Sequence, residues 1–333
     1  MRRPVDHLSG SEAPDVGPPA EAESRAGLVR RLRGLPVNHV SAVSDTPRPA
    51  SAGADGERAP LAGALRAGDN PTEPAEARVP KPPLWHHVSY FKTLWTDHQR
   101  RWPDPGGPEP DGADRRRRDD PPGSWRGSGD QYLSPDANSE ADSVIAALQQ
   151  CEPAVSELLQ VIEQENKHGG VLVGLEHSRK GADRIKEKLA EKIDLGLGDG
   201  PADVASAVRD AVRYTFCLDP DNYGAGHDDI VALLEAKGCS RDYSRNHWLD
   251  GGPYEGVNSQ WMSPGGGRFE LQFHTRESFY AKETLTHPAY ERLRSPATSW
   301  EERLELDAFQ ELVSGAVSEP HGIDQIADQE RRA

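Results

Sequence analysis

Proline is distributed very unevenly along this chain of 333 residues, and its distribution limits where a folded domain can form. Twenty of the 28 prolines precede Asn138. Because proline lacks a backbone N–H, segments such as residues 80–83 and 103–108 cannot sustain a helix or a central strand, and few apolar residues lie between them. We therefore expect residues 1–137 to be a largely disordered region rich in Pro, Gly and charge. Residues 138–317 should form the folded domain, and residues 318–333 an acidic polar tail.

One segment differs from the rest of the proline-rich region. Residues 84–95 concentrate two Trp, one Tyr and one Phe. The segment could pack against the folded domain, or it could be a docking motif or a plug of a pocket, since aromatic side chains often anchor interfaces. The sequence leaves both interpretations open.

Charge separates the same two halves. Residues 1–135 contain 19 Lys or Arg and 19 Asp or Glu, so the whole formal net charge of −16 belongs to the remainder of the chain. An acidic surface disfavours a broad contact with a nucleic-acid backbone and favours small ligands or ligands bridged by a metal ion.

Targeting signals are missing from the sequence. The N-terminus has no apolar segment of the Sec type, and no apolar run approaches the roughly 18 residues of a membrane span. We expect a cytoplasmic protein without a membrane partner, although export by a signal-independent route stays open. The three cysteines lack metal-binding spacing, and their odd number argues against a disulfide scaffold.

The folded half mixes helical and strand patterns. Ser139 is a plausible N-cap for a first helix, and apolar spacing indicates a second helix after Pro153. Strand patterns follow at residues 171–175, 211–218, 239–249, 256–262 and 268–274, and helical patterns at residues 182–193, 202–209, 227–237 and 300–317. This order predicts an α+β fold with a small mixed sheet flanked by helices, as in nucleotidyltransferases.

A row of cations is the first group that could carry chemistry. Lys180, Arg184 and Lys188 follow one another at intervals of four residues, which places them along one helical face or its approach. Arg179 adds a fourth cation beside them. Such a row can hold a triphosphate, although a solvated basic face would have the same spacing.

Carboxylates form the second group. Asp210 lies just before the strand pattern at residues 211–218, where a carboxylate can bind a hard cation. Arg213 lies within that strand pattern. Glu270, Gln272 and His274 alternate with three apolar residues, so they share the polar face of one strand. There Glu270 could bind Mg²⁺ or accept a proton from a hydroxyl group. A surface ion pair and the solvent side of an edge strand are the plainer alternatives.

A third group surrounds a glycine-rich turn. Tyr254 and Asn258 bring an aromatic ring and an amide to residues 254–258, and Tyr254 could stack on a base. A tyrosine that only covers the edge of the sheet would look the same in sequence.

Taken in chain order, these clusters resemble the synthetase domain of RelA/SpoT homologues, and more closely its compact and toxin-type members. The resemblance rests on four segments and covers about 125 to 150 residues: residues 179–189, 210–215, 254–258 and 269–275. Members of that family transfer a pyrophosphate from ATP to the 3′-hydroxyl of a nucleotide, or in some toxins to the 3′ end of tRNA.

The resemblance implies a role for each matched residue. It makes Asp210 and Glu270 the Mg²⁺ ligands and catalytic carboxylates, with Glu270 as the base that deprotonates the 3′-hydroxyl. It makes Tyr254 the residue that stacks on the acceptor base. The remaining residues would bind either ATP phosphates or the acceptor: Lys180, Arg179, Arg184, Lys188 and Arg213 for ATP, and Asn258, Gln272 and His274 for the acceptor.

Two positions depart from the family pattern, because Ser178 stands where an Arg is usual and Arg184 where a small Ser is usual. Either neighbouring arginines substitute, or the ATP site is altered. Three functions therefore stay open: a pyrophosphokinase using ATP, Mg²⁺ and an acceptor of the GDP, GTP or ADP class; a toxin that modifies a tRNA 3′ end and has an antitoxin or immunity protein; and a non-catalytic nucleotide-binding or interaction module.

Overall fold

The computed structural model describes residues 83–103, 115–127, 131–295 and 297–330. Its α-helices are α2 (Val88–Arg101), α3 (Pro135–Gln149), α4 (Glu152–Glu165), α5 (Ala182–Asp194), α6 (Pro201–Val204), α7 (Tyr223–Ala236), α8 (Arg276–Tyr280), α9 (His287–Arg294) and α10 (Trp300–Ser314). Its strands are β1 (Trp125–Arg126), β2 (Tyr132–Leu133), β3 (Val171–Val173), β4 (Arg213–Leu218), β5 (Ser240–Asn246), β6 (Val257–Met262) and β7 (Arg268–Thr275). This mixture confirms the predicted α+β class. Among the described helices, none has the length and apolar composition needed to cross a bilayer.

Shorter helical turns connect these elements. The 3₁₀ turns are η1 (Leu84–His86), η2 (Leu175–His177), η3 (Ala205–Ala207), η4 (Pro220–Asn222), η5 (His247–Leu249) and η7 (Ile323–Gln325), and η6 (Ala281–Thr286) is a π-helical turn. The helix predicted at residues 202–209 is shorter in the structure than in the prediction, because α6 ends after one turn and the 3₁₀ turn η3 follows it.

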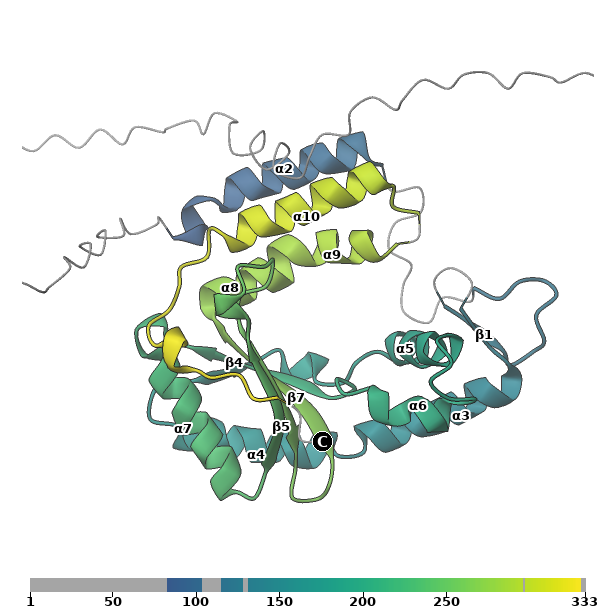
Figure 1. The fold of residues 1–333 in the computed structure, drawn as a ribbon, viewed down its shortest axis with the longest axis horizontal. Coiled ribbons are helices and arrows are strands. Elements are labelled where there is room, and N and C mark those ends of the chain that lie inside the picture. The colour runs from purple at the N-terminus through teal and green to yellow at the C-terminus, as the bar shows by residue number, and fades with distance from the viewer. Residues whose placement is uncertain (1–82, 104–114, 128–130, 296, 331–333) are drawn as a thin grey trace, which may run out of the picture.

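Five strands form one mixed sheet in the order β3-β4-β7-β6-β5 (Figure 1). The central strands β4 and β7 run parallel, whereas the other neighbours are antiparallel. In the register of the parallel pair, Arg213 lies beside Glu270 and Thr215 beside Gln272. Because side chains alternate along each strand, these four residues share one face of the sheet.

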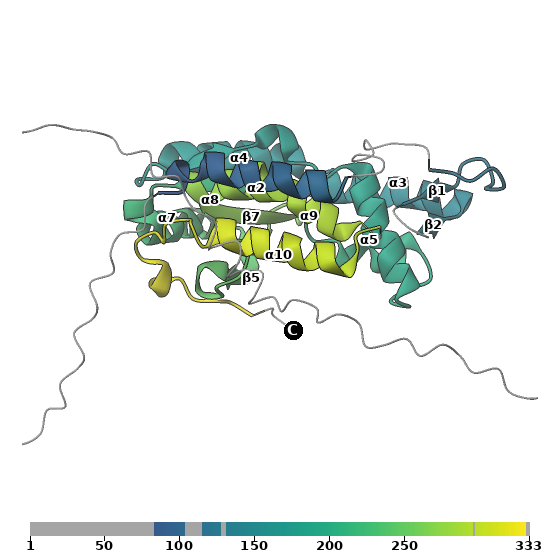
Figure 2. The same cartoon turned by 90° about the horizontal axis from the view of Figure 1, so that it is seen from above.

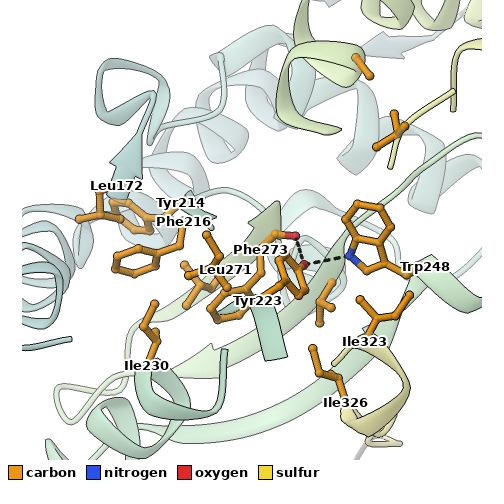
Figure 3. Close-up of a cluster of buried hydrophobic side chains, with 14 of the residues drawn as sticks. Leu172, Tyr214, Phe216, Tyr223, Ile230, Trp248, Leu271, Phe273, Ile323 and Ile326 are labelled. Atoms are coloured by element: carbon orange, nitrogen blue, oxygen red, sulfur yellow. Dashed lines mark hydrogen bonds between the residues drawn. The ribbon is translucent and has the colours of Figure 1, made fainter. Parts of the chain in front are cut away.

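The opposite face of the sheet is apolar and forms the main core (Figure 3). Phe216 and Phe273 stack across the central strands with ring centroids 6.4 Å apart, and Ile230 of α7 lies in the same cluster. Tyr223 is also buried there, and its hydroxyl donates a hydrogen bond of 2.8 Å to the Phe273 carbonyl. The period-two pattern of β7 thus places its phenylalanines where the sequence predicts them.

A second apolar cluster joins α3, α5 and α6. Its fully buried members include Ala141 and Ile145 of α3, Ile185 and Leu189 of α5 and Val204 of α6. This cluster fixes the position of α5, the helix that carries Arg184 and Lys188 of the predicted cation row.

The segment at residues 84–95 is helical, which corrects part of the expectation of disorder before residue 138. In both views α2 runs beside α10 (Figures 1 and 2). Phe91 and Leu94 of α2 are buried, and the Trp95 ring lies 5.8 Å from that of Phe309. Buried apolar area outweighs the prolines on either side of the segment. The part of the expectation that concerns residues 1–82 lies outside the described residues.

The first helix of the folded half begins earlier than expected. Ser134, not Ser139, is the N-cap of α3, and its hydroxyl accepts a hydrogen bond of 3.3 Å from the Ala137 amide. Pro135 occupies the first helical position, where its missing N–H costs nothing.

The expected polar tail also packs onto the domain. Ile323 and Ile326 are buried in the main core. The backbone of Gln329 forms two hydrogen bonds with Ser244 of the edge strand β5, of 3.0 and 2.9 Å. Two buried isoleucines and pairing with the free edge of β5 therefore attach this tail to the domain, although its sequence looks merely acidic.

Candidate functional site

Backbone pairing brings the first cations to the start of β4. Arg179 forms an antiparallel bridge with Val212, and the Lys180 amide donates to the Ala211 carbonyl at 3.0 Å. The Gln149 side chain donates to both the Lys180 and Ala211 carbonyls, at 2.8 and 3.3 Å. Residues 178–180 are thus held against residues 211–213, although a long stretch of chain separates them.

Lys180 and Lys188 converge on Asp210. Lys188 Nζ lies 2.7 Å from both carboxylate oxygens of Asp210, and Lys180 Nζ donates to Oδ2 of the same group. Burial alone would raise the pKa of Asp210, but the two ammonium groups outweigh it and hold the pKa at about 2. Asp210 is therefore a carboxylate at all physiological pH values.

The other two predicted cations of this group point elsewhere. Arg184 pairs with Glu187 at 3.1 Å and with Glu291 of α9. Arg179 is half exposed and pairs with Glu152 at 3.0 Å, because neighbouring residues of an extended segment point to opposite sides. Of the four cations in the predicted row, the structure brings only Lys180 and Lys188 together at Asp210.

Glu270 is oriented by two glutamine amides. Gln272 Nε2 donates to Glu270 Oε1 at 2.5 Å, and Gln260 Nε2 of β6 donates to Oε2 at 3.2 Å. Gln260 lies directly opposite Glu270 in the β6–β7 register. The carboxylate is half-buried and has no cation bonded to it among the described residues.

Arg213 lies at the centre of this polar face. Its side chain is half-buried and makes no hydrogen bond or ion pair within the part of the chain that the structure describes. Its charge helps to lower the pKa of Lys180, after burial, and that of Lys282 in the same way. Its charge also lowers the pKa of Glu283, so the guanidinium lies near lysines and a carboxylate while its side chain bonds to no described residue.

Tyr254 is fixed by two side chains from the sheet. Its hydroxyl donates to Asn258 Oδ1 at 2.5 Å and lies 2.9 Å from His274 Nε2. Because the hydroxyl gives its only proton to Asn258, His274 donates the second bond from Nε2. The other ring nitrogen, Nδ1, lies 3.0 Å from the hydroxyl of Ser278.

His274 consequently does not reach a phosphate. Its side chain is fully buried, and burial holds its pKa well below 6.5, with Lys282 lowering it further. Gly256 lies against the ring, since a Cβ atom there would be 2.7 Å from His274 Cε1. His274 is neutral and supports Tyr254 from behind, whereas the sequence predicts a substrate contact.

Sequence reasoning missed three residues of this face: Gln260, Lys282 and Glu283. Lys282 Nζ donates to Gln272 Oε1 at 3.0 Å and to Glu283 Oε1 at 2.5 Å. Strand alternation at residues 257–262 could have identified Gln260. No local pattern reveals Lys282, because its direction depends on the π-helical turn η6.

The donor set fits a magnesium ion that is shared with a nucleotide. Within the described residues no three His, Cys, Asp or Glu side chains cluster as a metal site. Mg²⁺ typically takes only one or two carboxylates together with substrate phosphates and water, so a cluster of three protein ligands is not required. Asp210 is ionised, and among the described side chains it bonds only to lysines, which phosphate groups could attract away.

An open depression of about 540 Å³ lies apart from this face, between α3 and α6. Acidic side chains line much of it, including Asp136, Glu140 and Asp199. These carboxylates would repel a triphosphate, so the polar face of the sheet remains the candidate site.

No protein-family model matches the chain, and no curated protein matches it. Solved structures do. The chain is similar to the type VI effector Tas1 in the complex with its immunity protein, at 20% identity over 52% of this chain and 95% of that chain, with a TM-score of 0.37. It is similar to a GTP pyrophosphokinase family protein from Streptococcus pneumoniae, at 15% identity over 55% and 92%, with a TM-score of 0.35.

A third similar structure is the small alarmone synthetase 1 from Bacillus subtilis bound to its product pppGpp. It is 14% identical over 52% of this chain and 88% of that chain, with a TM-score of 0.33. At these identities and scores the likeness concerns the fold alone and says nothing about the reaction. The chain is thus similar to solved structures of a type VI effector, a GTP pyrophosphokinase family protein and a small alarmone synthetase.

Proposed function

We propose that the polar face of the sheet binds ATP with Mg²⁺ and transfers pyrophosphate to the 3′-hydroxyl of a nucleotide of the GDP, GTP or ADP class. Arg213 carries this proposal. Its guanidinium is half-buried, has no partner among the described side chains, and lies where its charge acts on Lys180 and Lys282. A planar donor among other cations suits a phosphate chain, which it can bind through two hydrogen bonds at once.

Two further cations, Lys180 and Lys188, could also bind the phosphates. Lys180 and Lys188 both form ion pairs with Asp210. A triphosphate would compete for both ammonium groups, and the exchange would free Asp210 for Mg²⁺. Mg²⁺ held there and by Glu270 would neutralise charge on the phosphates during the transfer.

Glu270 would act as the base. Two amides fix its carboxylate, and no ammonium or guanidinium group of the described residues bonds to it, so it can accept the proton of the 3′-hydroxyl. The hydroxyl oxygen then forms a bond to the β-phosphorus of ATP. The bond from that phosphorus to the oxygen bridging the α-phosphate breaks, and AMP leaves. Positioning and charge supply most of the catalysis in such transfers.

Tyr254 belongs to the acceptor side. Its ring is held between His247 and His274, each 5.2 Å away by ring centroids and nearly perpendicular to it. A ring fixed at its hydroxyl end and packed against two imidazoles loses little freedom when a base stacks on it. Asn258 and Gln272 lie opposite each other in the register beside it.

A tRNA 3′ end as acceptor, with an antitoxin or immunity protein as partner, is the first alternative. The acidic charge of the folded half disfavours it. The second alternative is a binding module without ATP chemistry, which the departures at Ser178 and Arg184 suggest. In the structure Ser178 donates to Glu152 at 2.9 Å, and Arg184 is paired with acidic groups, so neither residue reaches Asp210.

Release of AMP distinguishes these alternatives. The full chain is incubated with Mg²⁺ and ATP labelled at the α-phosphate, together with GDP, GTP, ADP or deacylated tRNA. We expect AMP and an equal amount of 3′-pyrophosphorylated nucleotide, and Glu270→Gln should lower the rate at least about 100-fold. Glu301→Gln, an exposed glutamate of α10, is the matched control. AMP formed only with tRNA selects the toxin, and no AMP with any acceptor refutes catalysis.

A further inference from the structure

The π-helical turn η6 aims one lysine at the polar face. Lys282 is the second residue of this turn, and the Thr286 hydroxyl closes the turn by donating to the Ala281 carbonyl at 3.2 Å. Such turns are rare and often occur at functional sites, because the extra residue changes which side chains face inwards. The Lys282 side chain is about four-fifths buried.

The contacts of Lys282 lead to Glu270 through a single amide. Lys282 Nζ donates to Gln272 Oε1 at 3.0 Å, and Gln272 Nε2 donates to Glu270 Oε1 at 2.5 Å. Gln272 itself is buried. The three side chains come from η6 and β7 and form one chain of hydrogen bonds.

Charge decides which way the Gln272 amide points. The reverse orientation would place its NH₂ group against the ammonium of Lys282 and its oxygen against the carboxylate of Glu270. Both contacts would be repulsive. With Lys282 present, only one orientation satisfies both neighbours, and it directs an N–H donor at Glu270 Oε1.

We propose that Lys282 is a positioning residue that, through Gln272, holds the Glu270 carboxylate in the orientation needed to take the acceptor's proton. This inference rests on the proposed function of Glu270 as the base. Gln260 fixes Oε2 from β6 and Gln272 fixes Oε1 from β7, so the carboxylate plane is set from two sides. Without Lys282 the Gln272 amide can rotate, and one of the two supports is lost.

Glu283 completes the arrangement around the lysine. Its carboxylate accepts from Lys282 Nζ at 2.5 Å, which balances the nearby charge of Arg213. Lys282 therefore has two protein acceptors already, unlike Arg213. This difference assigns phosphate binding to Arg213 and positioning to Lys282.

Steady-state kinetics with Lys282→Met test the proposal. We expect kcat for AMP release to fall about 10- to 100-fold, as for a misplaced catalytic group, with KM for ATP and for the acceptor changed less than about threefold. Lys282→Arg keeps a donor and should recover part of kcat. Lys237→Met is the matched control, because Lys237 has similar exposure and a similar ion pair, 2.8 Å from Glu165.

A raised KM with unchanged kcat would show that Lys282 binds substrate instead, and unchanged kinetics would reduce it to a structural ion pair. Thermal unfolding of each variant reports whether it folds. The side-chain amide signals of Gln272 in ¹⁵N-correlated NMR spectra, assigned by their loss in Gln272→Ala, provide a readout that needs no activity. They should shift in Lys282→Met and stay in place in Lys237→Met. Unshifted signals overturn the inference even in an active enzyme, whereas shifted signals without AMP release would refute only the proposed reaction.

Discussion

The two faces of β7 differ in what their side chains do, although they alternate along one strand. Phe269, Leu271 and Phe273 are fully buried against the helices of the main core. Glu270 and Gln272, which alternate with them, bond to each other and to polar groups of β6 and η6. The apolar face should account for stability, whereas the polar face keeps a guanidinium and a carboxylate to which no oppositely charged group of the described residues bonds. The comparison separates residues that hold the fold from residues that serve a ligand.

Phe273→Ala should have the largest effect on stability. Removing this buried ring, which stacks on Phe216, should cost about 3–5 kcal/mol in the free energy of unfolding. Glu270→Gln, on the opposite face of β7, should lower the free energy of unfolding by less than about 1 kcal/mol, because glutamine has nearly the same shape as glutamate. Urea unfolding followed by circular dichroism measures both. Similar losses from the two variants would erase the distinction between the faces.

Asp210→Asn should have the next largest effect on the free energy of unfolding, and this effect should depend on pH. The folded-state pKa of about 2 lies below the ordinary 3.8, so the ion pairs of Asp210 stabilise the fold fully above pH 3.8 and are lost as the pH falls towards 2. The variant should lose about 2 kcal/mol at pH 6, and its deficit relative to wild type should shrink by about half at pH 3. Unfolding free energies at the two pH values test this, and a deficit that grows on acidification would contradict the assigned pairs.

Gly256→Ala should have a smaller effect, because it disturbs only the support of Tyr254. The added Cβ would lie 2.7 Å from His274 Cε1 and 3.0 Å from the Phe273 carbonyl oxygen. We expect a loss of about 1 kcal/mol in stability and a higher KM for the acceptor with little change in KM for ATP. Equal changes in the two KM values would show that Tyr254 does not belong to the acceptor side alone.

The sequence predicts the apolar face better than the polar one, for a physical reason. Burial repeats with the period of the strand, so the phenylalanines of β7 and the helices that cover them can be read from spacing alone. Contacts of charged side chains depend on where other elements end. Arg179 and Lys180 are neighbours in sequence, but backbone pairing with β4 sends only Lys180 to Asp210. Spacing by four residues places Arg184 one turn before Lys188, yet Glu291 of a distant helix attracts it.

Two other differences follow from tertiary packing. The aromatic residues at 84–95 form a helix because α10 offers them an apolar surface, which no local pattern reveals. His274 looks like a polar residue of the strand face, but the turn at Gly256 covers it. The order of the clusters could be predicted, whereas the partners of individual cations could not.

The affinity for Mg²⁺-ATP tests most directly whether the polar face binds phosphate. The sequence predicts both Arg213 and Arg179 as ATP-binding residues, but only Arg213 lies on the polar face of the sheet. Isothermal titration calorimetry compares wild type with Arg213→Gln and Arg179→Gln. Arg213→Gln should weaken Mg²⁺-ATP binding at least about tenfold, a loss of about 1.4 kcal/mol, whereas Arg179→Gln, which removes only a half-exposed pair with Glu152, should bind as wild type does. Equal losses in the two variants, or unchanged affinity in Arg213→Gln, would contradict a phosphate site on the polar face.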